Sequence, residues 1–173
     1  MTATNQVIAS SSKRARQLTE AEIAEIEHEK ELYPDHQAVG LEALKIVQKH
    51  QGWVSDESLL AIANYLDLPA AELEGVATFF NLVYRQPVGK HVILFCNSVS
   101  CWIMNCEDIR DHIKATLGVD FGETTADNLF TFIPVPCLGD CDRAPVMMVG
   151  VDLHRNLTPA KIDEIVAQYR SES

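Results

Sequence analysis

The sequence predicts a small all-α helical domain followed by a compact α/β domain. Two observations lead to this prediction. Apolar residues recur at helical spacing through the first half of the chain, and short continuous apolar runs, typical of buried strands, replace that spacing after Gly89. We therefore expect a flexible tail at 1–18, a helical domain at 19–88 and an α/β domain at 89–173.

The first eighteen residues contain no acidic residue but include Lys13, Arg14 and Arg16. Chain termini of this composition are commonly flexible, and we interpret residues 1–18 as a flexible tail. A mitochondrial presequence is the alternative, because such segments are rich in Ser, contain Arg and lack acidic residues.

The first helix of the helical domain is expected after Thr19, because Thr19 and Glu22 have the spacing of a capping box. Pro34 and Asp35 end it. Its acidic residues are interpreted as a solvated face, with a docking strip for a basic partner as the alternative. These residues are Glu20, Glu22, Glu25, Glu27, Glu29 and Glu31.

Three further helices follow in this domain. One covers roughly 38–50 and stops at Gly52, one starts after Ser55, and one starts near Pro69. The apolar residues that we expect to face the core are Leu41, Leu44, Val47, Leu59, Ile62, Ala63, Leu66, Leu73, Val76, Ala77 and Phe80.

The α/β domain is predicted from a change in the apolar pattern after Pro87 and Gly89. Its order of strand, helix, strand, strand, helix is typical of a compact α/β unit. The expected elements are a strand at 91–95, a helix at 102–117 that ends at Gly118, strands at 129–135 and 146–149, and a helix from Thr158 to about Tyr169.

The composition excludes several functional classes. The chain has 173 residues and a net charge of −11, so its surface would repel nucleic acid. No apolar run approaches the roughly 18 residues that cross a bilayer, and we expect no membrane insertion. An odd number of cysteines, five, without a signal peptide indicates reduced thiols in a cytoplasmic location, with the mitochondrial matrix as the alternative.

Four cysteines carry the predicted chemistry. Cys96 and Cys101 follow one expected strand, and Cys137 and Cys141 follow another, so neighbouring strands would bring four thiolates to one place. Convergent thiolates in a reducing compartment indicate a metal site. The spacing favours a binuclear iron–sulfur cluster over structural zinc. A redox-active dithiol is a third interpretation, weakened because the chain has no C-x-x-C pair.

The segment after Cys101 bears on the same site. A helix starting near Trp102 would direct its positive end at the cysteines. Cys106 falls inside that helix and is interpreted as a small buried apolar residue, or as a ligand in place of Cys101 if the helix starts later. Since motifs that bind nucleotides or catalytic zinc are absent, we expect the chain to carry electrons without binding a substrate.

Three segments carry a resemblance to a known family. They are ALKIVQKHQGWV at 43–54, LEGVATFFNLVYRQPVGKHVILFCNSVSC at 73–101 and PVPCLGDCDRAPVMMV at 134–149. The chain resembles the 24-kDa-type subunits (the E-type subunits in bacteria) of respiratory NADH:quinone oxidoreductase, complex I, over roughly residues 20–170. Similar modules occur in NAD-linked hydrogenases and formate dehydrogenases, which are the alternative parent enzymes.

The resemblance implies a thioredoxin-like domain with one 2Fe–2S cluster held by Cys96, Cys101, Cys137 and Cys141, while Cys106 matches no ligand position. It also implies that the helical domain packs against a flavoprotein subunit, which binds FMN and NADH, within a larger respiratory complex at the cytoplasmic face of the inner membrane. The cluster would exchange an electron with FMN from a side position. A structural zinc module without redox activity is the remaining alternative.

Overall fold

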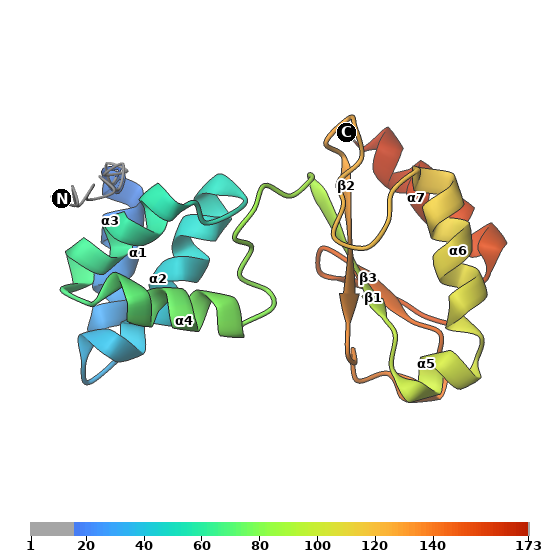
Figure 1. Cartoon of the computed structure of the whole chain (residues 1–173), viewed down its shortest axis with the longest axis horizontal. Helices are drawn as coiled ribbons and strands as arrows, with labels where there is room; N and C mark the ends of the chain where they lie inside the picture. Colours follow the sequence, from blue (N-terminus) through green and yellow to red (C-terminus); the bar gives the residue numbers. More distant parts are fainter. Residues whose placement is uncertain (1–15, 173) are drawn as a thin grey trace, which may run out of the picture. The chain divides into compact units, whose positions relative to one another are not determined.

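The computed structural model describes residues 16–172, so residues 1–15 of the predicted tail lie outside the described part. The chain divides into two compact units, Met1–Pro87 and Val88–Ser173. Each unit has its own hydrophobic core. Figure 1 shows the helices and strands of both units. The predicted fold class, a helical region followed by an α/β domain, is confirmed.

The first unit consists of four α-helices. They are α1 (Glu20–Lys30), α2 (His36–Gln51), α3 (Asp56–Leu66) and α4 (Ala70–Phe79). Side chains cap three of them, since Thr19, Asp35 and Ser55 each accept a hydrogen bond from a backbone N–H of the first turn. The predicted capping box of Thr19 is confirmed, and Gly52 ends α2 with φ 82°.

The core of this unit agrees with the predicted apolar faces in most positions. Leu41 and Val76 are half-buried against the core. The prediction for Phe80 was wrong: this residue is 41% exposed, because α4 ends at Phe79 and Phe80 adopts an extended backbone that turns it away from the helix face. The expected residues that are buried are Leu44, Val47, Leu59, Ile62, Ala63, Leu66, Leu73 and Ala77.

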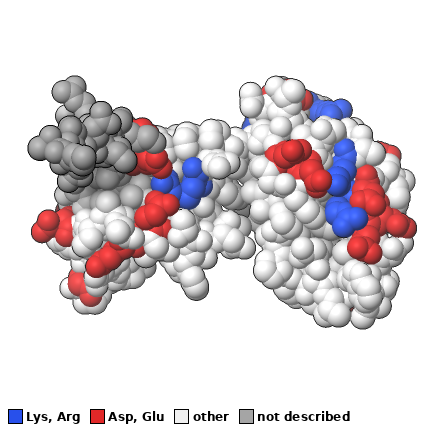
Figure 2. Space-filling view, viewed as in Figure 1, with Lys and Arg blue, Asp and Glu red and all other residues white. Residues whose placement is uncertain are grey.

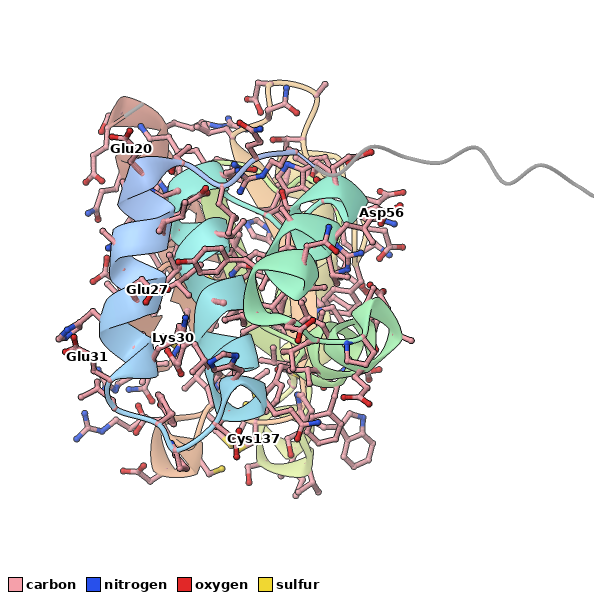
Figure 3. All side chains as sticks on the ribbon, turned by 90° about the vertical axis from the view of Figure 1, so that its left-hand side faces the viewer. Glu20, Glu27, Lys30, Glu31, Asp56 and Cys137 are labelled. Carbon is pink, nitrogen blue, oxygen red and sulfur yellow. The ribbon has the colours of Figure 1, made fainter. Side chains whose placement is uncertain are left out.

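The acidic first helix contains one buried carboxylate. Glu20, Glu27 and Glu31 are exposed along α1 (Figure 3). Glu22, which the sequence placed on the solvated face, is fully buried, and Arg16 donates to both of its oxygens at 2.8 and 3.0 Å. Arg16 Nε also donates to Ser58 Oγ at 2.8 Å, so this ion pair joins the segment before α1 to α3.

The Arg16–Glu22 pair makes a testable contribution to stability. Burial raises the pKa of Glu22, but hydrogen bonds from Arg16 and from the backbone N–H of Thr19 outweigh burial and lower it below 4.5. We expect Glu22→Gln to reduce the free energy of unfolding by about 2 kcal/mol at pH 7. A carboxylate whose pKa is lowered by folding stabilises the folded state at pH values above its pKa in the unfolded chain. The loss of stability caused by Glu22→Gln should therefore shrink as the pH falls below 4.5.

Urea denaturation followed by circular dichroism at pH 7 and in acid measures this difference. Glu20→Gln on the exposed side of the same helix is the matched control, for which a change of only a few tenths of a kcal/mol is expected. Equal effects of the two substitutions at pH 7 would show that the buried pair contributes nothing specific.

The second unit is built on a four-stranded mixed sheet of order β2-β1-β3-β4. Its strands are β1 (His91–Cys96), β2 (Phe130–Val135), β3 (Met147–Val149) and β4 (Asp152–His154). β1 runs parallel to β2 and antiparallel to β3. The sequence did not predict β4, because three partly exposed residues after a tight turn carry no strand pattern.

Two helices, α6 (Cys106–Leu117) and α7 (Pro159–Ser171), cover one face of this sheet (Figure 1). Alternate strand residues point toward them, because successive side chains of a strand face opposite sides. Thr158 caps α7 with Pro159 in its first turn, as predicted. The strand residues in this core are Ile93, Phe95, Cys96, Phe130, Phe132, Met147 and Val149.

The prediction of a single helix at 102–117 was wrong. The segment forms two helices, α5 (Val99–Ile103) and α6, separated by Asn105 with φ 61°. This left-handed backbone cannot continue a right-handed helix, and Asn tolerates it better than most residues. The predicted end of α6 at Gly118 is confirmed.

The helices are short for a bilayer. The longest helix, α2, has 16 residues and ends in Lys49, His50 and Gln51. Within residues 16–172, no helix is both long enough and apolar enough to cross a membrane.

Gly89 lies in the second unit, where its backbone closely approaches the backbone at the start of β2. A Cβ atom there would lie 2.9 Å from the backbone of Leu129 and of Phe130, and the Gly89 N–H donates to Thr131 Oγ1 at 2.6 Å. We expect Gly89→Ala to lower the free energy of unfolding by about 1–3 kcal/mol, because backbone atoms cannot move aside cheaply.

Gly75 in the middle of α4 is the control, since nothing lies within 4 Å of its added Cβ. Gly75→Ala should instead raise the free energy of unfolding by about 0.5–1 kcal/mol through better helix propensity. Urea titration of both variants tests the contrast, and a neutral Gly89→Ala would contradict the close approach.

Candidate metal centre

Two cysteine-bearing loops leave the same end of the sheet. Cys96 is the last residue of β1 and pairs in register with Val135, the last residue of β2. Because the two strands are parallel, their carboxyl ends meet at one edge (Figure 1). α5 then carries Cys101, and Cys137 follows β2 by two residues.

Cys137 and Cys141 form one close pair of thiols. Their sulfur atoms are 3.8 Å apart, and both side chains are exposed. Two thiolates bound at about 2.3 Å to one tetrahedral metal ion are separated by about 3.8 Å, so this pair already has the spacing of two ligands on one ion. Gly139, with φ 82°, turns the loop and donates its N–H to the Cys137 sulfur at 3.3 Å.

Cys96 and Cys101 form a second, buried pair. Burial, followed by hydrogen bonding to Cys96, raises the pKa of the Cys101 thiol to about 12, against an opposing backbone hydrogen bond at Val146. The Cys96 thiol lies 3.9 Å from the carbonyl oxygen of Pro136, to which it donates. Without a metal the Cys101 thiol is therefore neutral, and a bound metal would have to displace its proton.

The cysteines are arranged as two pairs. Among residues 16–172, no three His, Cys, Asp or Glu side chains surround one ion position. The sequence placed all four thiols at one point, whereas the structure brings them to one end of the sheet with Cys137 and Cys141 at the surface and Cys96 and Cys101 inside. Cys137 is labelled in Figure 3.

Cys106 is the first residue of α6 and is buried in the core with Ile109 and Ile113. Burial raises the pKa of its thiol, with further repulsion from Cys96. The expected helix start near Trp102 was wrong, because α5 starts at Val99 and has only five residues, and α6 starts at Cys106.

Sequence reasoning missed the contacts that hold the exposed loop. Arg155 donates to the Asp140 carboxylate, and the backbone N–H of Asn156 donates to the carbonyl oxygen of Arg143 at 2.8 Å. Lys161 Nζ donates to the carbonyl oxygen of Arg155 at 2.6 Å. Partners so far apart in the sequence leave no local signal, although together they fasten the Cys137–Cys141 loop to the segment before α7.

Comparison with known proteins gives the family. The model of the thioredoxin-like [2Fe-2S] ferredoxin family matches residues 26–170. The E-type subunit of NADH-quinone oxidoreductase from Salmonella typhimurium is 47% identical over 156 residues, which cover 90% of this chain and 94% of that protein. The chain belongs to the thioredoxin-like [2Fe-2S] ferredoxin family, in its group of E-type NADH-quinone oxidoreductase subunits.

Two more relatives agree. The E-type subunit of Escherichia coli K12 is also 47% identical over 90% of this chain and 94% of its own length. The corresponding subunit of Pseudomonas aeruginosa is 45% identical over 88% of this chain and 92% of its own length. The predicted family, the family's 2Fe–2S cluster and the role of an electron-transfer subunit in a multisubunit NADH-quinone oxidoreductase are thereby confirmed.

A solved structure shares the fold. The NAD+-reducing [NiFe]-hydrogenase in the H2-reduced state matches 78% of this chain with a TM-score of 0.66 and 21% sequence identity. The matched part is 22% of the hydrogenase chain, so this chain spans about a fifth of its length. At this identity the likeness concerns the fold alone.

The different burial of the two cysteine pairs predicts different reactivity in metal-free protein. Iodoacetamide should modify Cys137 and Cys141 roughly tenfold or more faster than the other three cysteines, because those three are buried and burial also raises the pKa values of the Cys101 and Cys106 thiols. Mass spectrometry of timed digests measures this order. Equal rates at all five positions would contradict the buried placement.

Proposed function

We propose that Cys96, Cys101, Cys137 and Cys141 ligate the 2Fe–2S cluster of the family, and that the chain exchanges electrons with FMN held by a flavoprotein partner. The observation that carries the proposal is the arrangement of these four thiols in two pairs at the end of two parallel strands. A cluster with two irons needs two thiolates on each iron, and thiolate is the donor that such clusters take.

The surrounding residues fit such a group. Cys96 and Cys101 are buried, so water is excluded from their side of the site. Gly139 donates its backbone N–H to the Cys137 sulfur. Hydrogen bonds of this kind reduce the negative charge on sulfur and tune a metal centre. Asp140 and Arg155 fix the loop that holds the exposed pair. When bound, the cluster supplies reversible one-electron transfer.

We infer the flavoprotein partner from the family resemblance and from the sequence motifs of this chain. Its sequence contains no glycine-rich nucleotide motif, so FMN and NADH are assigned to a partner subunit of the same complex. The names of the relatives place them in NADH-quinone oxidoreductase. We assign the chain to the cytoplasmic face of the membrane, as part of a peripheral arm.

Structural zinc is a second candidate, favoured by one observation. The 3.8 Å separation of the Cys137 and Cys141 sulfurs suits two ligands of a tetrahedral zinc ion as well as two ligands of an iron. A zinc-loaded chain would be colourless and redox-inactive, whereas an iron–sulfur chain would be reddish-brown. Elemental analysis for iron, acid-labile sulfide and zinc in anaerobically prepared protein separates the two.

Single substitutions test the ligand set. We expect serine at position 96, 101, 137 or 141 to lose or perturb the visible absorbance and the EPR signal after dithionite reduction, because an alkoxide is a poor substitute for thiolate at iron. Iron and sulfide content should fall together in the same variants.

Cys106→Ser is the matched control, since Cys106 is buried in the same core as Cys96 and Cys101 but is not one of the proposed ligands. Its spectrum and iron content should remain those of the native chain. Loss of iron from the Cys106 variant, or a native spectrum after any of the other four changes, would refute the proposed ligands.

A further inference from the structure

We infer that Asp140 and Arg155 form an opposed pair of charges that sets the reduction potential of the cluster in this chain. The Asp140 carboxylate disfavours the reduced state, and the Arg155 guanidinium offsets that effect while it holds the cysteine loop in place. The inference rests on the proposed function, which supplies the cluster, and it adds two charged residues that are not ligands.

Asp140 lies inside the loop that bears the exposed pair of cysteines. It directly precedes Cys141, so the Cα atoms of these two residues are about 3.8 Å apart. The carbonyl oxygen of Asp140 accepts a hydrogen bond from the backbone N–H of Arg143 at 3.2 Å, across the short 3-10 helix η1 (Cys141–Arg143). The Asp140 carboxylate is therefore carried by the same turn as a proposed ligand.

Water has little access to the Asp140 carboxylate. Its side chain is 18% exposed, whereas that of Asp142, on the other side of Cys141, is 77% exposed. Partly buried charges are screened much less by solvent and salt than exposed charges are. Both carboxylates neighbour Cys141 in the sequence, but Asp140 should have the larger effect on a group bound there.

The positive charge of the pair comes from a distant part of the sequence. Arg155 donates through Nε to the Asp140 carboxylate, and its own carbonyl oxygen accepts from Lys161 Nζ at 2.6 Å. The backbone N–H of Asn156 donates to the carbonyl oxygen of Arg143 at 2.8 Å. These contacts hold the guanidinium against the cysteine loop through both its side chain and the backbone beside it.

The other charged residues of segment 137–143 are more exposed to solvent. Arg143 is 55% exposed and lies 3.7 Å from Asp142, and exposed ion pairs of this kind contribute little. Figure 2 shows charged side chains of the second unit gathered over α6, away from the α5 end that bears Cys101. We therefore expect the Asp140–Arg155 pair to dominate the local charge of the cysteine loop.

The sign of each contribution follows from the charge that reduction adds. Net charge is one of the factors that set the potential of an iron–sulfur cluster. A fixed negative charge nearby repels the added electron, and a fixed positive charge attracts it. Removal of Asp140 and removal of Arg155 should therefore shift the potential in opposite directions. A pair that only fastened the loop would have no reason to give opposite signs.

A redox titration of the iron-loaded chain, followed by EPR, tests the inference. We expect Asp140→Asn to raise the midpoint potential and Arg155→Gln to lower it. Each should change the ratio of reduced to oxidised cluster at a fixed ambient potential roughly tenfold, which is about 59 mV for a one-electron couple. Because the two shifts cancel, the double variant should return to within about twofold of the native ratio.

Two controls separate charge from loop geometry. Asp142→Asn removes an exposed carboxylate that is equally close to Cys141 in the sequence, and it should change the ratio less than about twofold. Arg155→Lys keeps the positive charge but loses the planar guanidinium, so its potential should remain close to the native value. Asp140→Asn retains an oxygen that accepts from Arg155, which keeps the loop fastened in that variant.

Shifts of the same sign in Asp140→Asn and Arg155→Gln, or an unchanged potential in Asp140→Asn, would overturn the inference. So would loss of iron from Asp140→Asn, because the carboxylate would then be needed to hold the site. Comparison of Asp140→Asn with Asp142→Asn decides the case even where Arg155→Gln takes up no iron.

The native chain separates this inference from the proposed function. A native chain without the iron–sulfur spectrum overturns the proposed function and with it the basis of this inference. A native chain that has its cluster, but whose potential does not respond to the loss of either charge, leaves the proposed function standing. That result removes only the role assigned to Asp140 and Arg155.

Discussion

The parallel pairing of β1 with β2 is the constraint on which the metal centre depends. It sets Cys96 beside Val135 and sends both following loops out at one edge of the sheet. A shift of this pairing by one residue would turn every side chain to the other face and carry Cys96 away from its buried partner. The phenylalanines of both strands, packed beneath α6 and α7, fix the register because only one alternation buries them.

Burial gives the two cysteine pairs different chemical characters. The inner pair is buried and burial raises the pKa of its Cys101 thiol, so a bound metal would have to displace that proton inside the protein, whereas the outer pair is open to solvent. Metal binding of this kind is coupled to pH and to the packing around the site. In the short helix α5 at the same end of the unit, Cys101 is buried while Val99, Trp102 and Ile103 are exposed.

Much of this architecture could be predicted from the sequence, because helix caps and apolar spacing are local signals. Thr19 and Thr158 marked helix starts correctly, and the buried strands stood out as apolar runs. Features fixed by distant partners could not be predicted: the burial of Glu22 depends on Arg16 and Ser58, and β4 exists only because it pairs with β3. The break at Asn105 escaped notice because the apolar residues on either side of it keep helical spacing.

The two hydrophobic cores have no residue in common, and this separation has a consequence for maturation of the chain. The helical unit draws its stability from its own apolar faces and from the buried Arg16–Glu22 pair, none of which involves a cysteine. The helical unit can therefore fold before iron and sulfide bind to the chain. Proteases and chaperones that recognise unfolded segments would therefore not distinguish empty from loaded copies by this unit.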